Sequence, residues 1–236
     1  MTRELKKRII TSTLLFSLVI FCVFINWSIY FLFILIVSGI ALLEISKLII
    51  LVEISTSTNT FAKKWIPFRL ISFFYILFIF LIMSADFYNL GPVFIIYILL
   101  ICIFSDIGGY VVGKTIGGKK LTKISPNKTI SGSIGSFCFS LAPPFLFYIF
   151  DQSEHFYSFN NFLLCLQISL VCQLGDIFIS YIKRKAKVKD TGNFLPGHGG
   201  LLDRIDGIIF AIPYVWIYLN GLSALFEMWT GVLSRL

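Results

Sequence analysis

The sequence predicts an all-α polytopic membrane protein with about seven transmembrane helices. Two observations carry this prediction. The 236-residue chain is 57% hydrophobic and only 14% of its residues are charged, whereas soluble domains carry about 25% charged residues. The charges are also absent from long intervals, whose lengths approach the roughly 20 apolar residues that cross a hydrocarbon core. A soluble protein with buried core helices would show many more polar helix faces.

The predicted spans follow from six charge-free intervals, which cover residues 9–43, 70–85, 87–105, 129–150, 155–175 and 207–226. The first interval is 35 residues long, too long for one span, so we expect it to divide near Asn26-Trp27, which gives seven spans. It has no small-residue cleavage site, so we treat it as a retained span. The five cysteines lie inside predicted spans without a CxxC pair, and they indicate neither disulfides nor a zinc site.

Basic residues gather in the loops on one side of the predicted membrane. Of the 20 Lys and Arg residues, 18 precede the first span or lie between spans two and three, four and five, or six and seven. The opposite loops, around residues 26–30, 85–90 and 151–161, contain none. This is the positive-inside pattern, which places the N-terminus and the two long basic loops in the cytoplasm. The net charge of +8 therefore reflects topology, and we expect no nucleic-acid partner.

Four carboxylates are expected at one depth, near the cytoplasmic surface. Asp106 and Asp176 fall near the cytoplasmic ends of spans four and six, and Asp203 and Asp206 open span seven. The i, i+3 spacing of the last two places them on one helix face, with Arg204 pointing elsewhere. Like charges brought together need a cation, and oxygen ligands suit Mg²⁺, whose shell is usually completed by substrate phosphates. For Asp106 the alternative is an ion pair with a nearby Lys or Arg.

The loop after the sixth span has the composition of a phosphate site. Lys183 and Lys187 lie one turn apart and Lys189 follows. The run PGHGG allows close backbone approach to a ligand, because its glycines tolerate positive φ, and its exposed N–H groups can form an anion-binding concavity. His198, within that run, is either an acid, base or phosphate donor, or a structural hydrogen-bonding residue. The earlier loop, GKTIGGKKLTKISPNKTISG, repeats the combination of lysines, glycines and small hydroxyls.

Three other patterns are given structural interpretations. Glu44 and Lys47 also stand at i, i+3 and are expected to form an ordinary interfacial ion pair. The run GKTIGGKK resembles a Walker A loop, but Lys120 stands where Ser or Thr is required and a membrane span precedes it, so that assignment is excluded. The sequon NKT faces the cytoplasm on the predicted topology and is set aside. His155, in an outer loop, is expected to be solvated.

The residues alone therefore predict a metal-assisted phosphoryl or nucleotidyl transfer site at the cytoplasmic membrane surface. Basic side chains there can neutralise phosphate charge as it redistributes during transfer. A water-soluble polyphosphate would arrive from the cytosol, and the second substrate should be a lipid, because otherwise the spans have no purpose in the chemistry.

The stretch SYIKRKAKVKDTGNFLPGHGGLLDRID, residues 180–206, resembles the signature of CDP-diacylglycerol synthases, also called phosphatidate cytidylyltransferases. The matching positions are Ser180, Lys183-Arg184, Lys189-Asp190, Gly192, Leu195-Pro196, His198-Gly199-Gly200, Asp203-Arg204 and Asp206. A second block, SDIGGYVVGKTIGGKKLTKISPNKTISGSIG, is similar to the upstream cytoplasmic loop of that family. The resemblance covers roughly residues 91–219, whereas the first 90 residues agree only in being hydrophobic, which leaves the span count open.

The resemblance implies transfer of a cytidylyl group from CTP to phosphatidate, giving CDP-diacylglycerol and pyrophosphate with Mg²⁺ as cofactor. It implies metal ligation by Asp176, Asp203 and Asp206. Further implied roles are neutralisation of phosphate charge by Lys183, Arg184, Lys189 and Arg204, orientation by Ser180 and His198, and substrate binding by Asp106, Ser125, Lys128, Asp190, Gly199 and Gly200. The phosphatidate oxygen is already charged near neutral pH, so no general base is strictly required.

We expect one integral membrane domain over residues 1–236, with N-terminal spans in 1–90, catalytic helices and basic loops in 91–219, and a C-terminal tail in 220–236. A polar funnel should open to the cytoplasm of a bacterial inner membrane and laterally to lipid, and the chain is a possible homodimer. The nearest rival is another enzyme, either a CTP-dependent polyprenol kinase, which would release CDP, or a synthase for a different lipid acid. A transporter is a rival from another class, but its acids usually lie near the bilayer midplane.

Overall fold

The structure is a computed structural model that describes residues 3–55, 62–122, 124–151, 158–192, 194 and 199–233. Regular structure in these ranges is helical, apart from an isolated bridge between Lys120 and Thr129. The helices are α1 (Arg3–Ile25), α2 (Trp27–Ser55), α3 (Ala62–Asn89), α4 (Gly91–Thr115), α5 (Ile130–Ser140), α6 (Ala142–Asp151), α7 (Phe159–Lys185), α8 (Leu202–Ile205) and α9 (Ile208–Leu233). The all-α class is confirmed.

Each predicted span coincides with helical structure. Five helical segments in the described ranges are long and apolar enough to cross a membrane, and they cover 27–55, 67–87, 91–115, 130–149 and 159–185. The apolar segments Thr13–Ile25 and Ile208–Gly221 are shorter. The protein is therefore a multi-pass membrane protein, and the count of seven spans stays a prediction.

Two helix breaks have local causes in the sequence. The predicted division near Asn26 is confirmed, because its side chain accepts a hydrogen bond from the Ile29 backbone N–H at 2.9 Å and so caps the start of α2. The other break, after Leu141, divides the fifth predicted span into α5 and α6. Pro143 and Pro144 lie in the first turn of α6, where a missing N–H does no harm.

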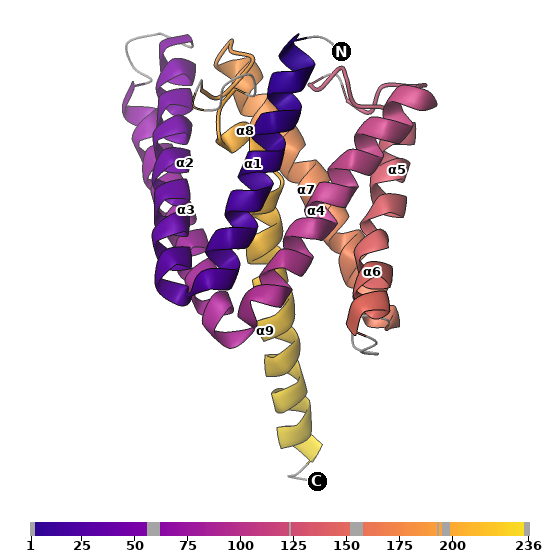
Figure 1. The fold of residues 1–236 in the computed structure, drawn as a ribbon. Coiled ribbons are helices and arrows are strands. Elements are labelled where there is room, and N and C mark those ends of the chain that lie inside the picture. The colour runs from indigo at the N-terminus through magenta and orange to yellow at the C-terminus, as the bar shows by residue number, and fades with distance from the viewer. Residues whose placement is uncertain are drawn as a thin grey trace.

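The loops predicted to be basic lie at one end of the molecule (Figure 1). The N-terminus, the end of α2, the α4–α5 loop and the end of α7 share the upper end of that view. The α1–α2 and α3–α4 turns lie at the opposite end, where α9 extends beyond the other helices. The loop between α4 and α5 and the end of α7, where the two lysine- and glycine-rich loops begin, thus lie on one side, as the charge pattern predicted.

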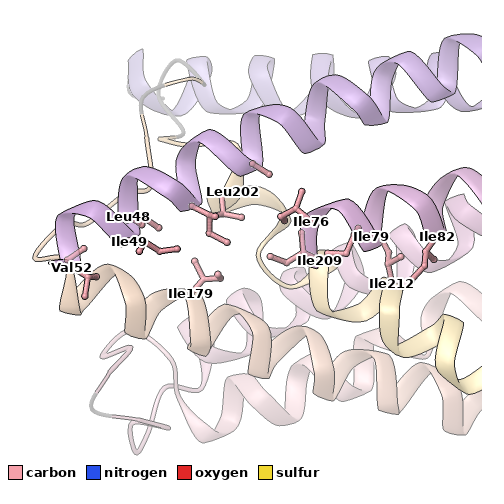
Figure 2. Packing of buried hydrophobic residues seen from close by; sticks show 13 residues of the cluster. Leu48, Ile49, Val52, Ile76, Ile79, Ile82, Ile179, Leu202, Ile209 and Ile212 are labelled. Atoms are coloured by element: carbon pink, nitrogen blue, oxygen red, sulfur yellow. The ribbon is translucent and has the colours of Figure 1, made fainter. Parts of the chain in front are cut away.

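A hydrophobic cluster between α2, α3, α7, α8 and α9 holds the site helices together (Figure 2). Leu48 of α2, Ile179 of α7 and Leu202 of α8 are each fully buried in it. A second cluster joins α4, α7 and α9 around Ile101 and Ile168. Because both clusters include α7 and α9, these two helices form the fixed frame from which Asp176 and Asp206 are positioned.

Glycines bring α4 and α5 into backbone contact. A Cβ placed on Gly108 would lie 2.4 Å from the Gly135 carbonyl oxygen, and one on Gly135 would lie 2.5 Å from the Val112 side chain. Small residues at such positions let membrane helices approach closely. With α4 and α5 this close, Asp106 of α4 lines the same polar cavity as Thr129 and Ser133.

Candidate active site

A polar cavity of about 440 Å³ lies where α4, α5, α7 and α8 meet the 121–129 loop. Nine of the predicted site residues line it: Asp106, Ser125, Lys128, Asp176, Lys183, Asp190, Asp203, Arg204 and Asp206. Sequence segments up to a hundred residues apart thus contribute to one chamber. The convergence of the four predicted carboxylates on one cavity is confirmed.

Of the remaining predicted residues, Ser180, Gly199 and Gly200 contact residues that line this chamber. Ser180 donates a hydrogen bond to Asp176 Oδ1 at 3.3 Å, and Gly200 donates its N–H to Asp203 Oδ2 at 3.1 Å. Gly199 has a positive φ of 80°, which agrees with the expected need for glycine at this turn. Arg184 and Lys189 are solvent-exposed, and His198 lies outside the described residues.

The loop before α5 is shaped by its own sequence. The Lys128 N–H donates to the Ser125 carbonyl at 3.1 Å, which closes a turn with Pro126 at its second position. Thr129 then caps α5 by accepting the Gly132 N–H at 3.1 Å. This local structure directs the Lys128 ammonium to Asp176 of α7, with which it forms an ion pair.

Asp203 accepts hydrogen bonds from three donor groups. Lys183 Nζ donates to Oδ1 at 2.7 Å, and the N–H groups of Thr191 and Gly200 donate to Oδ2 at 2.8 and 3.1 Å. The Thr191 hydroxyl lies 3.1 Å from the same oxygen. Burial raises the pKa of Asp203, but these hydrogen bonds and the Lys183 charge outweigh it, so the pKa lies below its ordinary value.

Asp206 has the opposite environment. Burial, and next the carboxylates of Asp176 and Asp106, raise the pKa of Asp206 to about 8. A hydrogen bond to Asp176 contributes in the same direction, and Lys183 opposes it. Asp206 therefore holds a proton beside the Asp176 carboxylate near neutral pH, and a bound cation could take the place of that proton.

The donor set fits a divalent cation bound by two carboxylates. Across the described residues, no three His, Cys, Asp or Glu side chains converge closely enough to hold a metal ion. Asp176 and Asp206 form a contacting pair, and Mg²⁺ usually takes one or two carboxylates with water and substrate phosphates. Asp203 is bonded instead to Lys183 and to the backbone N–H groups of Thr191 and Gly200, so its role as a third ligand stays a prediction.

The structure corrects two side-chain expectations. Arg204 does not point away from Asp203 and Asp206, because it lines the same polar cavity as both. The helix is interrupted here, with α8 ending at Ile205 and α9 starting at Ile208, so spacing on one continuous helix misplaced the arginine. The predicted ion pair of Glu44 with Lys47 was also wrong: Glu44 is 7% exposed and bonds to residues 191, 201 and 202.

Sequence reasoning missed Glu44 and Thr191 as site residues. Nothing in their neighbourhood marks them, since Glu44 lies 147 positions from Thr191, its hydrogen-bond partner. The one available signal was an acid at the end of a long charge-free interval, because a carboxylate within a membrane span is costly without a partner.

An apolar cavity of about 540 Å³ adjoins the polar one. Side chains of α1, α2, α3, α4 and α9 line it, among them Phe16, Ile34 and Ile76. Its polar end is formed by Asp106, Asp203 and Arg204, which also line the polar cavity. The two cavities therefore share a wall of one arginine and two carboxylates.

The fold and the site together define a class: a multi-pass membrane protein with a carboxylate-rich polar cavity beside an apolar one. A family model described as "Cytidylyltransferase family" matches residues 46–222. The phosphatidate cytidylyltransferase of Bacillus subtilis (strain 168) is 35% identical over 187 residues, which cover 77% of this chain and 69% of that protein. The chain belongs to the cytidylyltransferase family, and it is a nucleotidyltransferase.

Two further relatives carry the same name. The phosphatidate cytidylyltransferase of Rickettsia bellii (strain RML369-C) is 45% identical over 123 residues, covering 50% of this chain and 53% of that protein. That of Staphylococcus aureus (strain COL) is 44% identical over 131 residues, covering 55% and 50%. The matched segments thus span about half the length of these two relatives.

Proposed function

We propose that this chain is a CTP:phosphatidate cytidylyltransferase that makes CDP-diacylglycerol and pyrophosphate for phospholipid synthesis. The observation that carries the proposal is the shared wall of the two cavities, formed by Asp106, Asp203 and Arg204. The polar chamber contains lysines and an arginine, which suit the phosphates of a nucleoside triphosphate. The apolar chamber suits the acyl chains of a lipid. The names of the relatives support the same pair of substrates.

The reaction joins the two chambers at that wall. A phosphate oxygen of phosphatidate forms a bond to the α-phosphorus of CTP, while the bond from that phosphorus to the β-phosphate oxygen breaks and pyrophosphate leaves. The attacking oxygen is already anionic, so alignment and charge neutralisation are what the protein supplies. Arg204 lines both chambers, and a guanidinium can bind two phosphate oxygens at once.

Two lysines act on the carboxylates as well as on substrate. Lys128 pairs with Asp176 and Lys183 with Asp203, so each ammonium holds a carboxylate in place at the cavity wall and adds positive charge for the phosphates. Asp176 and Asp206 would hold Mg²⁺, which supplies further neutralisation of phosphate charge when bound. We assign the chamber to the cytoplasmic side of a bacterial inner membrane, because the basic loops follow the positive-inside pattern.

The test uses purified protein in detergent micelles with phosphatidate, Mg²⁺ and CTP labelled at the α-phosphate. We expect label to move into the lipid fraction, and Asp206→Asn or EDTA to reduce transfer by about 100-fold or more. Asp86→Asn, the same change on α3 away from both cavities, is the matched control and should retain activity. Label that moves into lipid only from γ-labelled CTP would show a lipid kinase, and no transfer from either label would contradict the proposal.

We also propose that two copies of the chain form a homodimer, as expected from the sequence. Light scattering coupled to size-exclusion chromatography in detergent, with the detergent mass subtracted, would give the mass of the protein part. A mass near twice 26.9 kDa supports the dimer, and a single-chain mass contradicts it.

A further inference from the structure

A buried carboxylate on α2 connects the N-terminal helices to the signature loop. Glu44 is 7% exposed and accepts three hydrogen bonds: from the Thr191 hydroxyl at 2.7 Å, the Leu201 N–H at 3.0 Å and the Leu202 N–H at 2.8 Å. A buried charge is tolerated only when hydrogen-bonded in this way. Glu44 also precedes the segment that matches the family, residues 46–222, so that match assigns it no role.

Glu44 and Asp203 are joined through one threonine. The Thr191 hydroxyl lies 2.7 Å from Glu44 and 3.1 Å from Asp203, and the Thr191 N–H also donates to Asp203. A hydroxyl has a single hydrogen, so the shorter contact, to Glu44, is the donated bond. The chain Glu44–Thr191–Asp203–Lys183 thus runs from α2 to the wall of the polar cavity.

The backbone of the signature segment packs so closely against Glu44 that side chains larger than glycine do not fit at two positions. A Cβ on Gly192 would lie 2.7 Å from Glu44 Oε1, and a Cβ on Gly200 would lie 2.5 Å from Oε2 and 1.9 Å from the Thr191 hydroxyl. The glycines on both arms of the signature loop are therefore packed against this carboxylate. Leu201 and Leu202, whose N–H groups bind it, begin the helix that carries Asp203 and Arg204.

We propose that Glu44 is a positioning residue for the transfer reaction: it fixes Thr191 and residues 201–202 on α2, so that Asp203 keeps its place at the junction of the two cavities and Lys183 its place beside Asp203. The Glu44 side chain lines neither cavity. The inference rests on the proposed function, and it predicts that an α2 residue outside the signature controls turnover.

The first experiment compares Glu44→Gln with Glu53→Gln, the same change on the same helix at a residue paired with Arg69. Glutamine keeps the volume but turns an amide N–H₂ toward groups that are themselves donors. We expect Glu44→Gln to lower kcat about 10- to 100-fold, since small misplacements of reacting groups cost that much, with a melting temperature close to that of Glu53→Gln. Wild-type kcat per folded molecule, or a loss of melting temperature alone, would overturn the proposal.

Variants of the threonine test the same connection without changing the membrane span. Thr191→Ser keeps the hydroxyl and should retain activity, whereas Thr191→Val should lose about as much as Glu44→Gln. The double variant Glu44→Gln/Thr191→Val should be no worse than either single variant, because residues in one network are not additive. Fully additive losses would overturn the proposed connection.

A measurement independent of activity separates this inference from the proposed function. In a cysteine-free background, Leu201→Cys reports opening of the loop, since Leu201 is 5% exposed. Adding Glu44→Gln should speed maleimide labelling of this cysteine by about tenfold, the scale set by losing hydrogen bonds to a charged group. Glu53→Gln should not change the rate. Unchanged labelling in Glu44→Gln overturns the inference even if transfer itself is confirmed, and faster labelling supports it even if the substrate assignment fails.

Discussion

Burial, and next the nearby carboxylates of Asp176 and Asp106, raise the pKa of the Asp206 carboxyl group, which makes stability depend on pH. Its pKa is raised from 3.8 to about 8, so the folded chain holds a proton that the unfolded chain releases above about pH 4. The contribution of Asp206 to stability is therefore complete at low pH and is lost as the pH rises through about 8. A divalent cation should replace the lost proton.

We accordingly expect the melting temperature in EDTA to fall between pH 6.5 and 8.5, and Mg²⁺ to raise it more at pH 8.5 than at pH 6.5. Differential scanning fluorimetry in detergent measures both effects. The reference is the Asp206→Asn variant, whose side chain cannot ionise. Its melting temperature should not show the fall between pH 6.5 and pH 8.5 that Asp206 causes in the wild type. An equal pH slope in wild type and variant would contradict the assignment of the proton to Asp206.

At the same scale, single residues show what the sequence could and could not predict. Asp106, Asp176 and Asp206 were predictable because each is a charge inside or beside an apolar run, which is costly without a function. Glu44 met the same criterion, yet its i, i+3 partner Lys47 offered a local explanation. Only the fold shows that the carboxylate turns inward to Thr191 while Lys47 is exposed.

Among the elements, α4 and α5 depend most on exact spacing. Gly135→Ala would place a methyl group 2.7 Å from the Gly108 carbonyl oxygen and 2.5 Å from Val112, so α5 must move away from α4. Overpacking of this kind typically costs about 1–3 kcal/mol. We expect a lower melting temperature and reduced transfer, because Asp106 and Lys128 lie on the two sides of this contact.

The matched control for this helix contact is Gly39→Ala on α2, where an added Cβ meets nothing within 4 Å. It should leave the melting temperature unchanged or slightly higher, because alanine favours helix. Equal melting temperatures for the two variants would show that α4 and α5 are not held together at Gly135.

Helix positions were more predictable than helix ends. Each charge-free interval coincides with helical structure in the described residues, and the division predicted near Asn26 is where α2 begins. The break after Leu141 was missed since a Pro-Pro pair is compatible with the first turn of a new helix as well as with a kinked span. The separation of α8 from α9 was missed for a different reason: Asp206 and Gly207 were counted as part of one helix, and the turn there redirects Asp203 toward Lys183.

For the whole molecule, the charge pattern makes a directional prediction. Leu90 and Ile116 flank the two ends of α4, and both are exposed. Cysteines introduced there, as Leu90→Cys and Ile116→Cys, should lie on opposite sides of the membrane. In a cysteine-free background in intact cells, an impermeant maleimide should label Leu90→Cys only, and both after permeabilisation. The reverse labelling pattern would place the polar cavity outside the cytoplasm.

The assembly of the site was the least predictable property at this scale. Its parts come from α2, α4, α5, α7, α8 and two loops, and periodicity within one segment carries no information on which segments meet. The signature region could be read as a unit because its residues lie within 27 positions, 180–206. Its attachment to α2 and the apolar cavity formed with α1 and α3 required the packed structure.

The common wall of the two cavities has a consequence for how the substrates are counted. Under the proposed function, CTP and pyrophosphate exchange with the aqueous volume, whereas both lipids exchange only with the surrounding leaflet. The lipid concentration that governs the rate is then a surface density, the fraction of phosphatidate among neighbouring lipids, and it is independent of the bulk amount. Diluting the membrane with inert lipid slows such an enzyme as surely as removing substrate, so the composition of the bilayer becomes a reactant variable in its own right.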